Sequence, residues 1–295
     1  MSQPGPTPAF VDTGAVRRAF TRAAAHYGEG DFLAREIDRR MLERLDYVRI
    51  DPRCLIDLGC SLGASLPALR ERYPQALALG VDFAPAMIRR AHAAMPAWRR
   101  WLPFARSNTA FLAGDANALP LPGACAGLLW SNLLLHWLDD PRPAFAEAHR
   151  VLEVGGLLMF SALGPDSFKE LRSAFADGHA HTQRFADMHD LGDMLVHAGF
   201  ADPVMDMEVL TLTYDSFDTL LAELRQSGGR CAMHARNHGL SGRAVWQAAR
   251  EAYARQAIDG RLPVTIEIVY GHAWKAQPKK TADGRAVIQF SQRPK

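Results

Sequence analysis

The feature that most constrains this fold is the alternation of short apolar strands with helices between residues 54 and 162. Parallel strands are joined by crossovers of about a dozen residues or more, usually helical, so the alternation predicts a parallel sheet covered by helices on both faces. The expected strands are residues 54–57, 76–82, 110–113, 127–131 and 157–162, and the expected helices are 64–73, 85–94 and 143–152. The fold class is therefore α/β.

The second half of the chain adds to this sheet. It predicts a helix at 191–198, strands at 204–214 and 264–275, and helices at 216–226 and 243–257 between those strands. We expect the segment 215–260 to form a helical insertion that caps one edge of the sheet. Nearer the N-terminus, residues 15–45 have helical spacing of apolar side chains, broken at Gly28–Gly30, and the segment 15–50 is expected to be a helical lid on the domain 15–276.

The two ends of the chain carry weaker signals. Residues 1–14 contain three prolines and lack the apolar run of a signal peptide, so they predict a disordered lead-in. Residues 277–295 form a polar tail, in which 286–290 could add an edge strand. Since no apolar stretch reaches membrane-spanning length, we expect a cytoplasmic protein that does not bind a membrane.

Composition excludes several other classes. A formal net charge of +2 on 295 residues argues against a protein that binds nucleic acid by bulk charge, and 48% hydrophobic residues are enough for one large core. The four cysteines form no C-x-x-C pair, and the histidines at 179, 181 and 189 match no metal-ligand spacing. We therefore expect neither a disulfide framework nor a metal.

The motif with the clearest chemistry is a D-x-G-x-S-x-G turn formed by Asp57, Gly59, Ser61 and Gly63. It follows a buried strand and opens a helix, and its small residues allow a tight turn close to a ligand. The spacing differs from the G-x-G-x-x-G pattern that holds a pyrophosphate. An acid at the strand end suits instead a ligand with an ammonium group, although an ordinary strand-to-helix turn would look the same.

Two further acids follow the next two strands. Asp82 ends the second strand, where a carboxylate can accept hydrogen bonds from a ribose diol, and Asp115 follows the third, where it could accept from the amine of adenine. Phe83 and Met87 either pack on the adenine or belong to the core. Because the carboxyl ends of parallel strands share one edge, we expect these acids to line a single ligand crevice.

These residues resemble the class I S-adenosylmethionine (SAM)-dependent methyltransferases. The resemblance implies a Rossmann-like sheet of seven strands, mostly parallel, whose final strand, 264–275, is antiparallel. It also implies SAM as the cofactor, with Asp57, Gly59 and Gly63 on its methionine part, Asp82 on the ribose and Asp115 on the adenine. Ser61 stands where the family usually has glycine. The other positions expected at the cofactor are Ala116, Ser131 and Asn132.

Short motifs outside the cofactor site indicate a particular branch. The stretch Trp130 to Trp137 lacks the N-P-P-aromatic pattern of nucleobase and amide methyltransferases and resembles the malonyl-acyl-carrier-protein O-methyltransferases of biotin synthesis. The segments 20–27, 114–121, 224–228 and 270–274 resemble the same family. That resemblance implies methylation of the free carboxylate of a malonyl thioester, with malonyl-acyl carrier protein or malonyl-CoA as the partner.

A sister family matches nearly as well. Residues 131–137, 164–171 and 190–200 also resemble the arginine-hydroxylating assembly factor of respiratory complex I. An assembly factor or SAM-fold hydroxylase of that type is thus one alternative, and an enzyme that methylates a free small acid is another. A dehydrogenase that uses NAD is more distant, because the turn lacks its glycine fingerprint.

Four residues are candidates for binding the methyl acceptor. A malonyl carboxylate is ionised at pH 7 and needs no base, so we expect positioning groups in place of a catalytic triad. Tyr27 could lie over the methyl group, and His136 and Trp137 could line the acceptor pocket. Arg225 could face the carboxylate or the pantetheine arm. Ordinary packing or solvent exposure would explain each of them equally simply. Arginine clusters that could dock an acidic carrier are Arg18/Arg22, Arg35/Arg39, Arg40/Arg44 and Arg225/Arg230/Arg236/Arg243.

Overall fold

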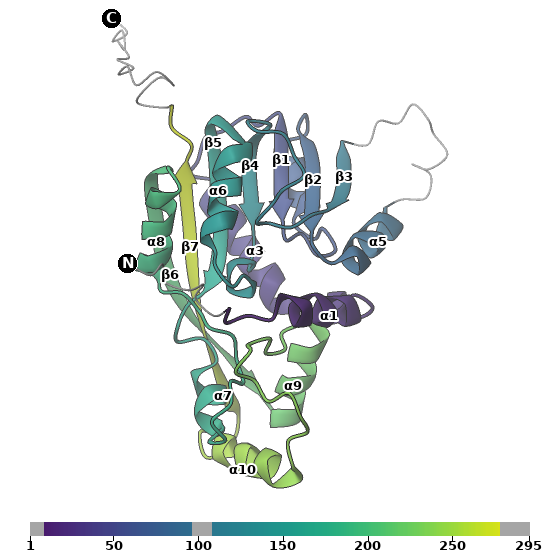
Figure 1. The fold of residues 1–295 in the computed structure, drawn as a ribbon, viewed down its shortest axis with the longest axis vertical. Helices are drawn as coiled ribbons and strands as arrows, with labels where there is room; N and C mark the ends of the chain where they lie inside the picture. Colours follow the sequence, from purple (N-terminus) through teal and green to yellow (C-terminus); the bar gives the residue numbers. More distant parts are fainter. Residues whose placement is uncertain (1–8, 96–107, 278–295) are drawn as a thin grey trace, which may run out of the picture.

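A seven-stranded sheet forms the centre of the molecule (Figure 1). The computed structural model describes residues 9–95 and 108–277, and within them the strands run in the order β3-β2-β1-β4-β5-β7-β6. β7 is antiparallel to both of its neighbours, and the pairs among β1 to β5 are parallel. The predicted fold is confirmed. The strands are β1 (Cys54–Leu58), β2 (Leu77–Asp82), β3 (Thr109–Ala113), β4 (Ala126–Ser131), β5 (Leu152–Leu163), β6 (Ala201–Tyr214) and β7 (Leu262–Trp274).

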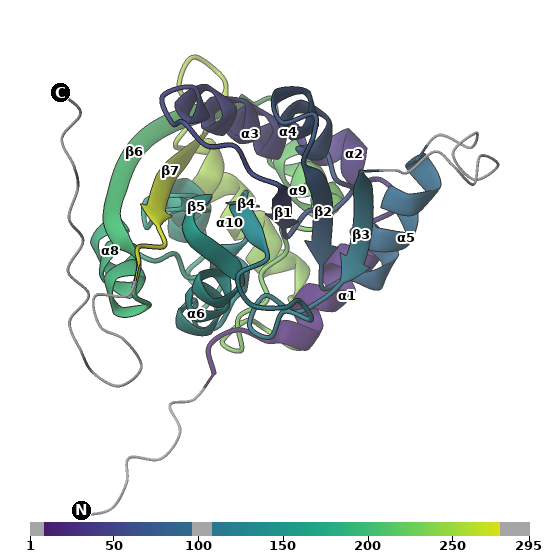
Figure 2. The ribbon, with the colours of Figure 1, turned by 90° about the horizontal axis from the view of Figure 1, so that it is seen from above.

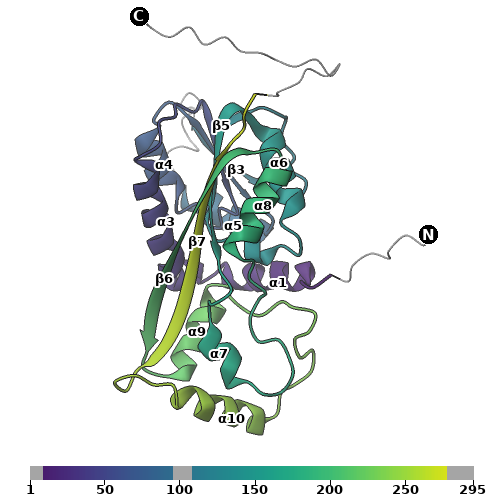
Figure 3. The same ribbon diagram turned by 90° about the vertical axis from the view of Figure 1, so that its left-hand side faces the viewer.

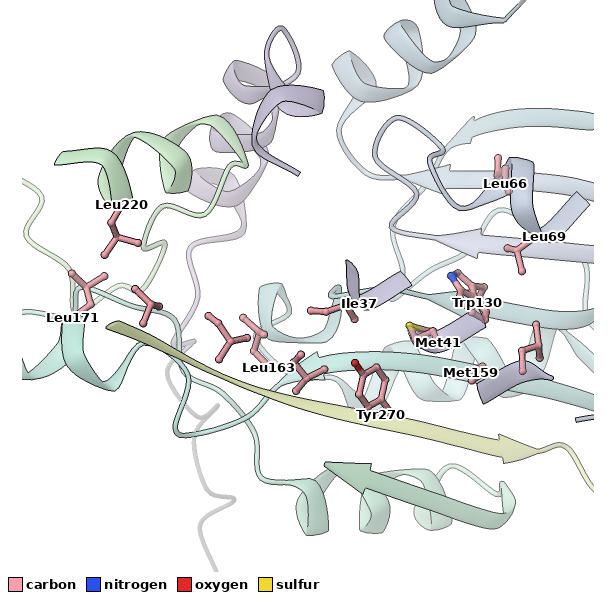
Figure 4. Packing of buried hydrophobic residues seen from close by; sticks show 14 of the residues in the cluster. Ile37, Met41, Leu66, Leu69, Trp130, Met159, Leu163, Leu171, Leu220 and Tyr270 are labelled. Atoms are coloured by element: carbon pink, nitrogen blue, oxygen red, sulfur yellow. The ribbon is translucent and has the colours of Figure 1, made fainter. Parts of the chain in front are cut away.

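Helices cover both faces of this sheet (Figure 2). Alternate residues of a strand point to opposite faces, and the core follows this rule. Leu128 and Trp130 of β4 pack in one apolar cluster with α3 (Phe32–Leu45) and α4 (Leu66–Arg72), as Figure 4 shows in part. Leu129 packs on the opposite face with α6 (Arg142–Val151) and α8 (Met188–His197). A further helix, α5 (Pro85–Ala94), packs beside β2 and β3.

The long ends of β6 and β7 carry a second group of helices (Figures 1 and 3). α7 (Lys169–Ala174) follows β5, whereas α9 (Phe217–Gln226) and α10 (Arg243–Ala254) fall within the segment predicted as an insertion. Two buried contacts fix α7 and α10 to β7: Thr265 N donates to the Glu170 carboxylate at 2.9 Å, and the Tyr253 hydroxyl donates to Pro263 O at 2.7 Å. α7 and α10 are therefore anchored to the same sheet as the helices that cover its two faces.

The N-terminal part differs from the single broken helix expected at 15–45. It forms three helices, α1 (Thr13–Ala23), α2 (Tyr27–Gly30) and α3. α1 lies between the sheet and α9 in Figure 1. A Cβ on Gly30 would lie 2.8 Å from that of Gln226, so glycine allows α2 to approach α9 closely. This approach draws the N-terminal segment over the carboxyl ends of the strands.

Strand β6 starts earlier than the predicted residue 204. The strand pattern is interrupted there because the pairing with β7 shifts between Ala201 and Val204, and Asp202 has a left-handed φ of 50°. An irregularity of this kind hides the alternation that marks a strand in the sequence. Among the described residues, no helix is long and apolar enough to cross a bilayer. The possible strand at 286–290 lies outside those residues, as does most of the predicted lead-in.

Candidate active site

A cavity lies at the carboxyl ends of β1, β2 and β4, beneath the N-terminal helices. Side chains from distant parts of the sequence line it together. The predicted site residues among them are Tyr27, Asp57, Gly59, Ser61, Asp82, Phe83, Asn132, His136 and Trp137. The sheet topology explains this convergence, because parallel strands present their carboxyl ends at one edge.

The turn after β1 is held against the end of β2. Gly59 and Gly63 both have φ of 78°, and Ser61 has φ of 49°. The Asp82 carboxylate accepts hydrogen bonds from Ser61 N at 3.0 Å and Ala84 N at 2.8 Å. Serine pays a steric penalty in the left-handed region that glycine avoids, so the carboxylate helps to hold Ser61 in this conformation. Asp82 thus shapes the turn as well as lining the cavity.

Asp57 places a buried carboxylate at the cavity. The residue is 2% exposed, and its Oδ2 has no hydrogen-bond partner within residues 9–95 and 108–277. Burial raises the pKa of this carboxyl well above its usual value, and the nearby Asp38 and Asp82 raise it further. A buried carboxylate without a partner is costly, and a bound cation would compensate it. The position therefore suits a positively charged group of a ligand.

Aromatic side chains close the cavity on the side of α1. The Phe20 ring lies 5.1 Å from Trp137, 6.3 Å from Tyr27 and 6.5 Å from Phe83, measured between ring centroids. Burial raises the pKa of Tyr27 to about 12, so its phenol stays protonated at neutral pH. Such a cluster can exclude water and offers flat faces to an aromatic or sulfonium ligand.

His136 forms the floor near this aromatic cluster. It lies in the 3₁₀ turn Leu135–Trp137, 5.0 Å from Trp137 and 5.8 Å from Phe185 between centroids. Burial lowers the pKa of His136 to about 3, and no described residue forms a hydrogen bond with its Nδ1. The imidazole is therefore neutral at pH 7. It can donate a hydrogen bond to a ligand or accept one, but it has no extra proton to transfer to the ligand.

The sequence did not single out Asp31 and Asp38, which also line the cavity. Asp38 is 9% exposed, and its Oδ1 accepts from Ser65 Oγ at 2.8 Å and Trp130 Nε1 at 2.9 Å. One signal was present: Asp38 lies three and seven residues before Met41 and Leu45, on the apolar face of α3. A carboxylate on an apolar stripe indicates a buried polar contact.

The remaining predicted site residues do not line this cavity. Met87 is fully buried among apolar side chains, which agrees with its alternative role in the core. Asp115 is exposed and accepts from Asn117 N at 2.9 Å, whereas Ala116 is buried. Ser131 is buried and donates to Leu58 O at 3.1 Å. Gly63 lies under the Phe111 ring, and a Cβ on this glycine would be only 2.6 Å from a ring carbon. Arg225 lines a neighbouring cavity.

Comparison with known proteins gives this geometry a family. Residues 56–160 match the model of a methyltransferase domain. The chain is 47% identical over 280 residues to the malonyl-acyl-carrier-protein O-methyltransferase of Nitrosospira multiformis, covering 92% of this chain and 91% of that one. The corresponding protein of Gallionella capsiferriformans is 44% identical over 283 residues, covering 95% and 97%.

The chain belongs to the malonyl-acyl-carrier-protein O-methyltransferase family. Its fold is also that of the YcgJ protein from Bacillus subtilis, with a TM-score of 0.57 at 15% identity over 81% of this chain and 98% of the other. Membership agrees with the resemblance seen in the sequence, and it makes the chain an enzyme of the methyltransferase class. The role of each side chain in the cavity is not given by the comparison and is proposed below.

Proposed function

We propose that this chain transfers the methyl group of SAM to the free carboxylate of a malonyl thioester on acyl carrier protein. The reaction is supported by sequence identities of 47% and 44%, over more than nine tenths of the chain, to methyltransferases of that name. The structural observation that supports it most is the buried Asp57 carboxylate, whose Oδ2 has no partner among the described residues. SAM carries two positive groups, an ammonium and a sulfonium, and an acidic, aromatic-walled cavity suits both. Placement in biotin synthesis and in the cytoplasm stays a prediction.

The cavity residues fit this cofactor at both of its ends. Asp57 would bind the ammonium group, and Gly59 and Ser61 would bring the backbone close to the methionine part. Asp82 would accept from the ribose hydroxyls with lone pairs left over from its two backbone contacts. Phe83 would pack on the adenine. SAM, when bound, supplies an electrophilic methyl group.

The residues of the chain would then act by position. The acceptor carboxylate is already ionised, so its oxygen would take the methyl group as the S–CH3 bond breaks, S-adenosylhomocysteine would leave, and no residue would have to remove a proton. Tyr27 and Trp137 would exclude water, and neutral His136 would orient the acceptor with a hydrogen bond. Alignment of reacting groups in this way contributes several kcal/mol. Asp115, Ala116, Ser131 and Met87, which lie outside the cavity, would contribute at most through the shape of the adenine region.

A transfer assay tests the proposal directly. Purified protein is incubated with methyl-labelled SAM and, separately, malonyl-acyl carrier protein, malonyl-CoA or free malonate. Label on the carrier conjugate supports the proposal. Label only on free malonate assigns the chain to small-acid methylation, and SAM binding without any transfer favours an assembly role.

A second test concerns the cofactor alone. Asp82→Ala should weaken SAM binding by about tenfold or more, because a ribose contact is lost and the turn that holds Ser61 is released. Isothermal titration measures the dissociation constant. Unchanged affinity in a folded variant would remove Asp82 from the proposed site.

A further inference from the structure

A second cavity opens beside the first one, among the lower helices. It lies between α7, α9, the start of α10 and the loop 229–241. Four residues line both cavities: Leu171, His181, Leu224 and Gly229. The two spaces therefore share one wall. We call the second cavity the outer cavity and the first one the inner cavity. A long, thin substrate could lie in the outer cavity and extend its reactive end past the shared wall into the inner cavity.

The outer cavity is basic. Among the residues that the structure describes, its lining contains Arg225, Arg230 and Arg236 and no acidic residue. Arg236 is used within the fold, since it donates to Met233 O and to the Asp12 carboxylate, both at 2.8 Å. Arg225 and Arg230 are exposed and form no ion pair with an acid of the ranges 9–95 and 108–277. Two guanidinium groups are thus available to an anion.

The two predicted arginine clusters on α3 are neutralised in the fold. On α3, Arg35 pairs with Asp31 at 2.9 Å and Arg39 with Glu36 at 2.8 Å. Arg44 pairs with Asp206 at 2.8 Å, and Arg40 pairs with Glu36 and Glu208. A carboxylate beside each guanidinium cancels its attraction for an acidic partner. Within the described residues, the outer cavity therefore keeps two unpaired guanidinium groups, whereas the arginines of the α3 clusters are paired.

The same cavity also offers apolar surface. The Phe175 and Trp246 rings meet edge to face with centroids 5.5 Å apart, and His181 stacks on Phe175 at 3.5 Å. At the rim, Leu240 is fully exposed. An occupant that matches this lining has an anionic group for the two unpaired guanidinium groups and a slender apolar arm.

We propose that the outer cavity binds the phosphopantetheine arm of malonyl-acyl carrier protein, with Arg225 and Arg230 on its phosphodiester. The proposal rests on the function proposed above. Charge complementarity selects the phosphate and the acidic carrier next to it, and the apolar wall receives the pantetheine. The arm would pass along Leu171, His181, Leu224 and Gly229, which line both cavities, and would place the malonyl thioester in the inner cavity.

The test compares two substrates that differ in the phosphate and the carrier. Arg225→Ala, Arg230→Ala and the double variant are assayed with malonyl-acyl carrier protein and with malonyl-pantetheine, which has neither. For the carrier substrate, the double variant should lose about tenfold in kcat/KM, mainly through KM, because charge-assisted contacts to the phosphate are lost. For malonyl-pantetheine, kcat/KM should stay within about twofold, since that substrate never made the contact. Arg89→Ala, an exposed arginine of α5, is the matched control.

A binding measurement separates docking from chemistry. Fluorescently labelled malonyl-acyl carrier protein is titrated with each variant, and SAM affinity is measured alongside. Weaker carrier binding at equal SAM affinity supports the proposal. Equal losses on both substrates, or unchanged carrier binding and kinetics, would overturn it while leaving the methyltransferase function standing. If the wild type methylates neither substrate, the function fails, and carrier binding alone still decides the docking site.

Discussion

At the scale of single residues, Asp57 is a buried carboxylate whose burial is unfavourable in the free protein and suits a bound cation. It is buried, Oδ2 has no partner, and two other carboxylates raise its pKa. A raised pKa in the folded state means that the group's stability contribution is full below its ordinary value of 3.8 and is lost as the pH rises toward the folded value. Binding strength and stability should therefore respond in opposite directions to its replacement.

We predict that Asp57→Asn weakens SAM binding by about tenfold or more and leaves the free protein as stable or more stable, because a buried unpaired charge is removed. The gain in stability should grow as the pH rises from 4 toward 8. Chemical denaturation at several pH values measures the free energy of unfolding, and calorimetry measures SAM affinity. A variant that is destabilised at pH 8 yet binds SAM normally would contradict both halves.

His136 gives the opposite dependence on pH. Its pKa falls from 6.5 to about 3 on burial, so the unfolded chain binds a proton in that interval and the folded protein does not. The stability linked to this group is full above pH 6.5 and is lost as the pH falls toward 3. His136→Phe should remove this dependence, whereas the exposed His234→Phe should keep it. Unfolding measured between pH 7 and 4 compares the three proteins, and parallel curves for all of them would disprove the burial argument.

At the scale of elements, Asn132 ties three parts of the chain together. Its Nδ2 donates to Ala34 O at 2.7 Å, and its Oδ1 accepts from Ser161 Oγ at 2.7 Å. The first bond reaches α3 and the second reaches β5. The side chain was predicted to contact the cofactor, and both of its polar atoms have partners within the protein. Its contribution to the cavity would then be the position of α3.

We predict that Asn132→Ala lowers the free energy of unfolding by about 1–3 kcal/mol, since two part-buried hydrogen bonds are lost. Hydrogen exchange should rise most in 32–45, because α3 loses its attachment to the strand ends. Asn117→Ala, at an exposed turn, is the control. Uniform exchange across the whole sheet would indicate general destabilisation in place of a local release of α3.

The elements also show which parts of the fold and the site could be predicted from the sequence. The carboxylates of Asp57 and Asp82 could be placed together because parallel strand ends share an edge and the strands are marked by apolar runs. Asp38 could not, because its hydrogen bonds to Ser65 and Trp130 join segments far apart in the chain. Likewise α7 is only six residues long, too short for a helical period to stand out, and tertiary contacts such as Glu170 with Thr265 stabilise it.

At the scale of the whole molecule, charge is distributed unevenly although the total is small. The formal net charge is only +2, so long-range attraction of an acidic carrier must come from local patches. We predict that raising the ionic strength lowers kcat/KM for malonyl-acyl carrier protein by about tenfold between low and high salt, through slower association. The same change should leave malonyl-pantetheine turnover almost unaffected. Stopped-flow association rates at several salt concentrations measure the effect, and equal salt dependence for both substrates would place the recognition elsewhere.

The pairing of Tyr214 with Leu262 has a consequence for how such a protein can diversify. Everything between these two residues leaves the sheet from β6 and returns on the adjacent β7, so its two ends are neighbours fixed by backbone contacts. A segment closed in this way can be lengthened, shortened or exchanged as a cassette, while the register of every strand beneath it is kept. Selection could thus retune the choice of acceptor through this cassette, which supplies Leu224 and Gly229 to both cavities, and keep the carboxylates of β1 and β2 unaltered.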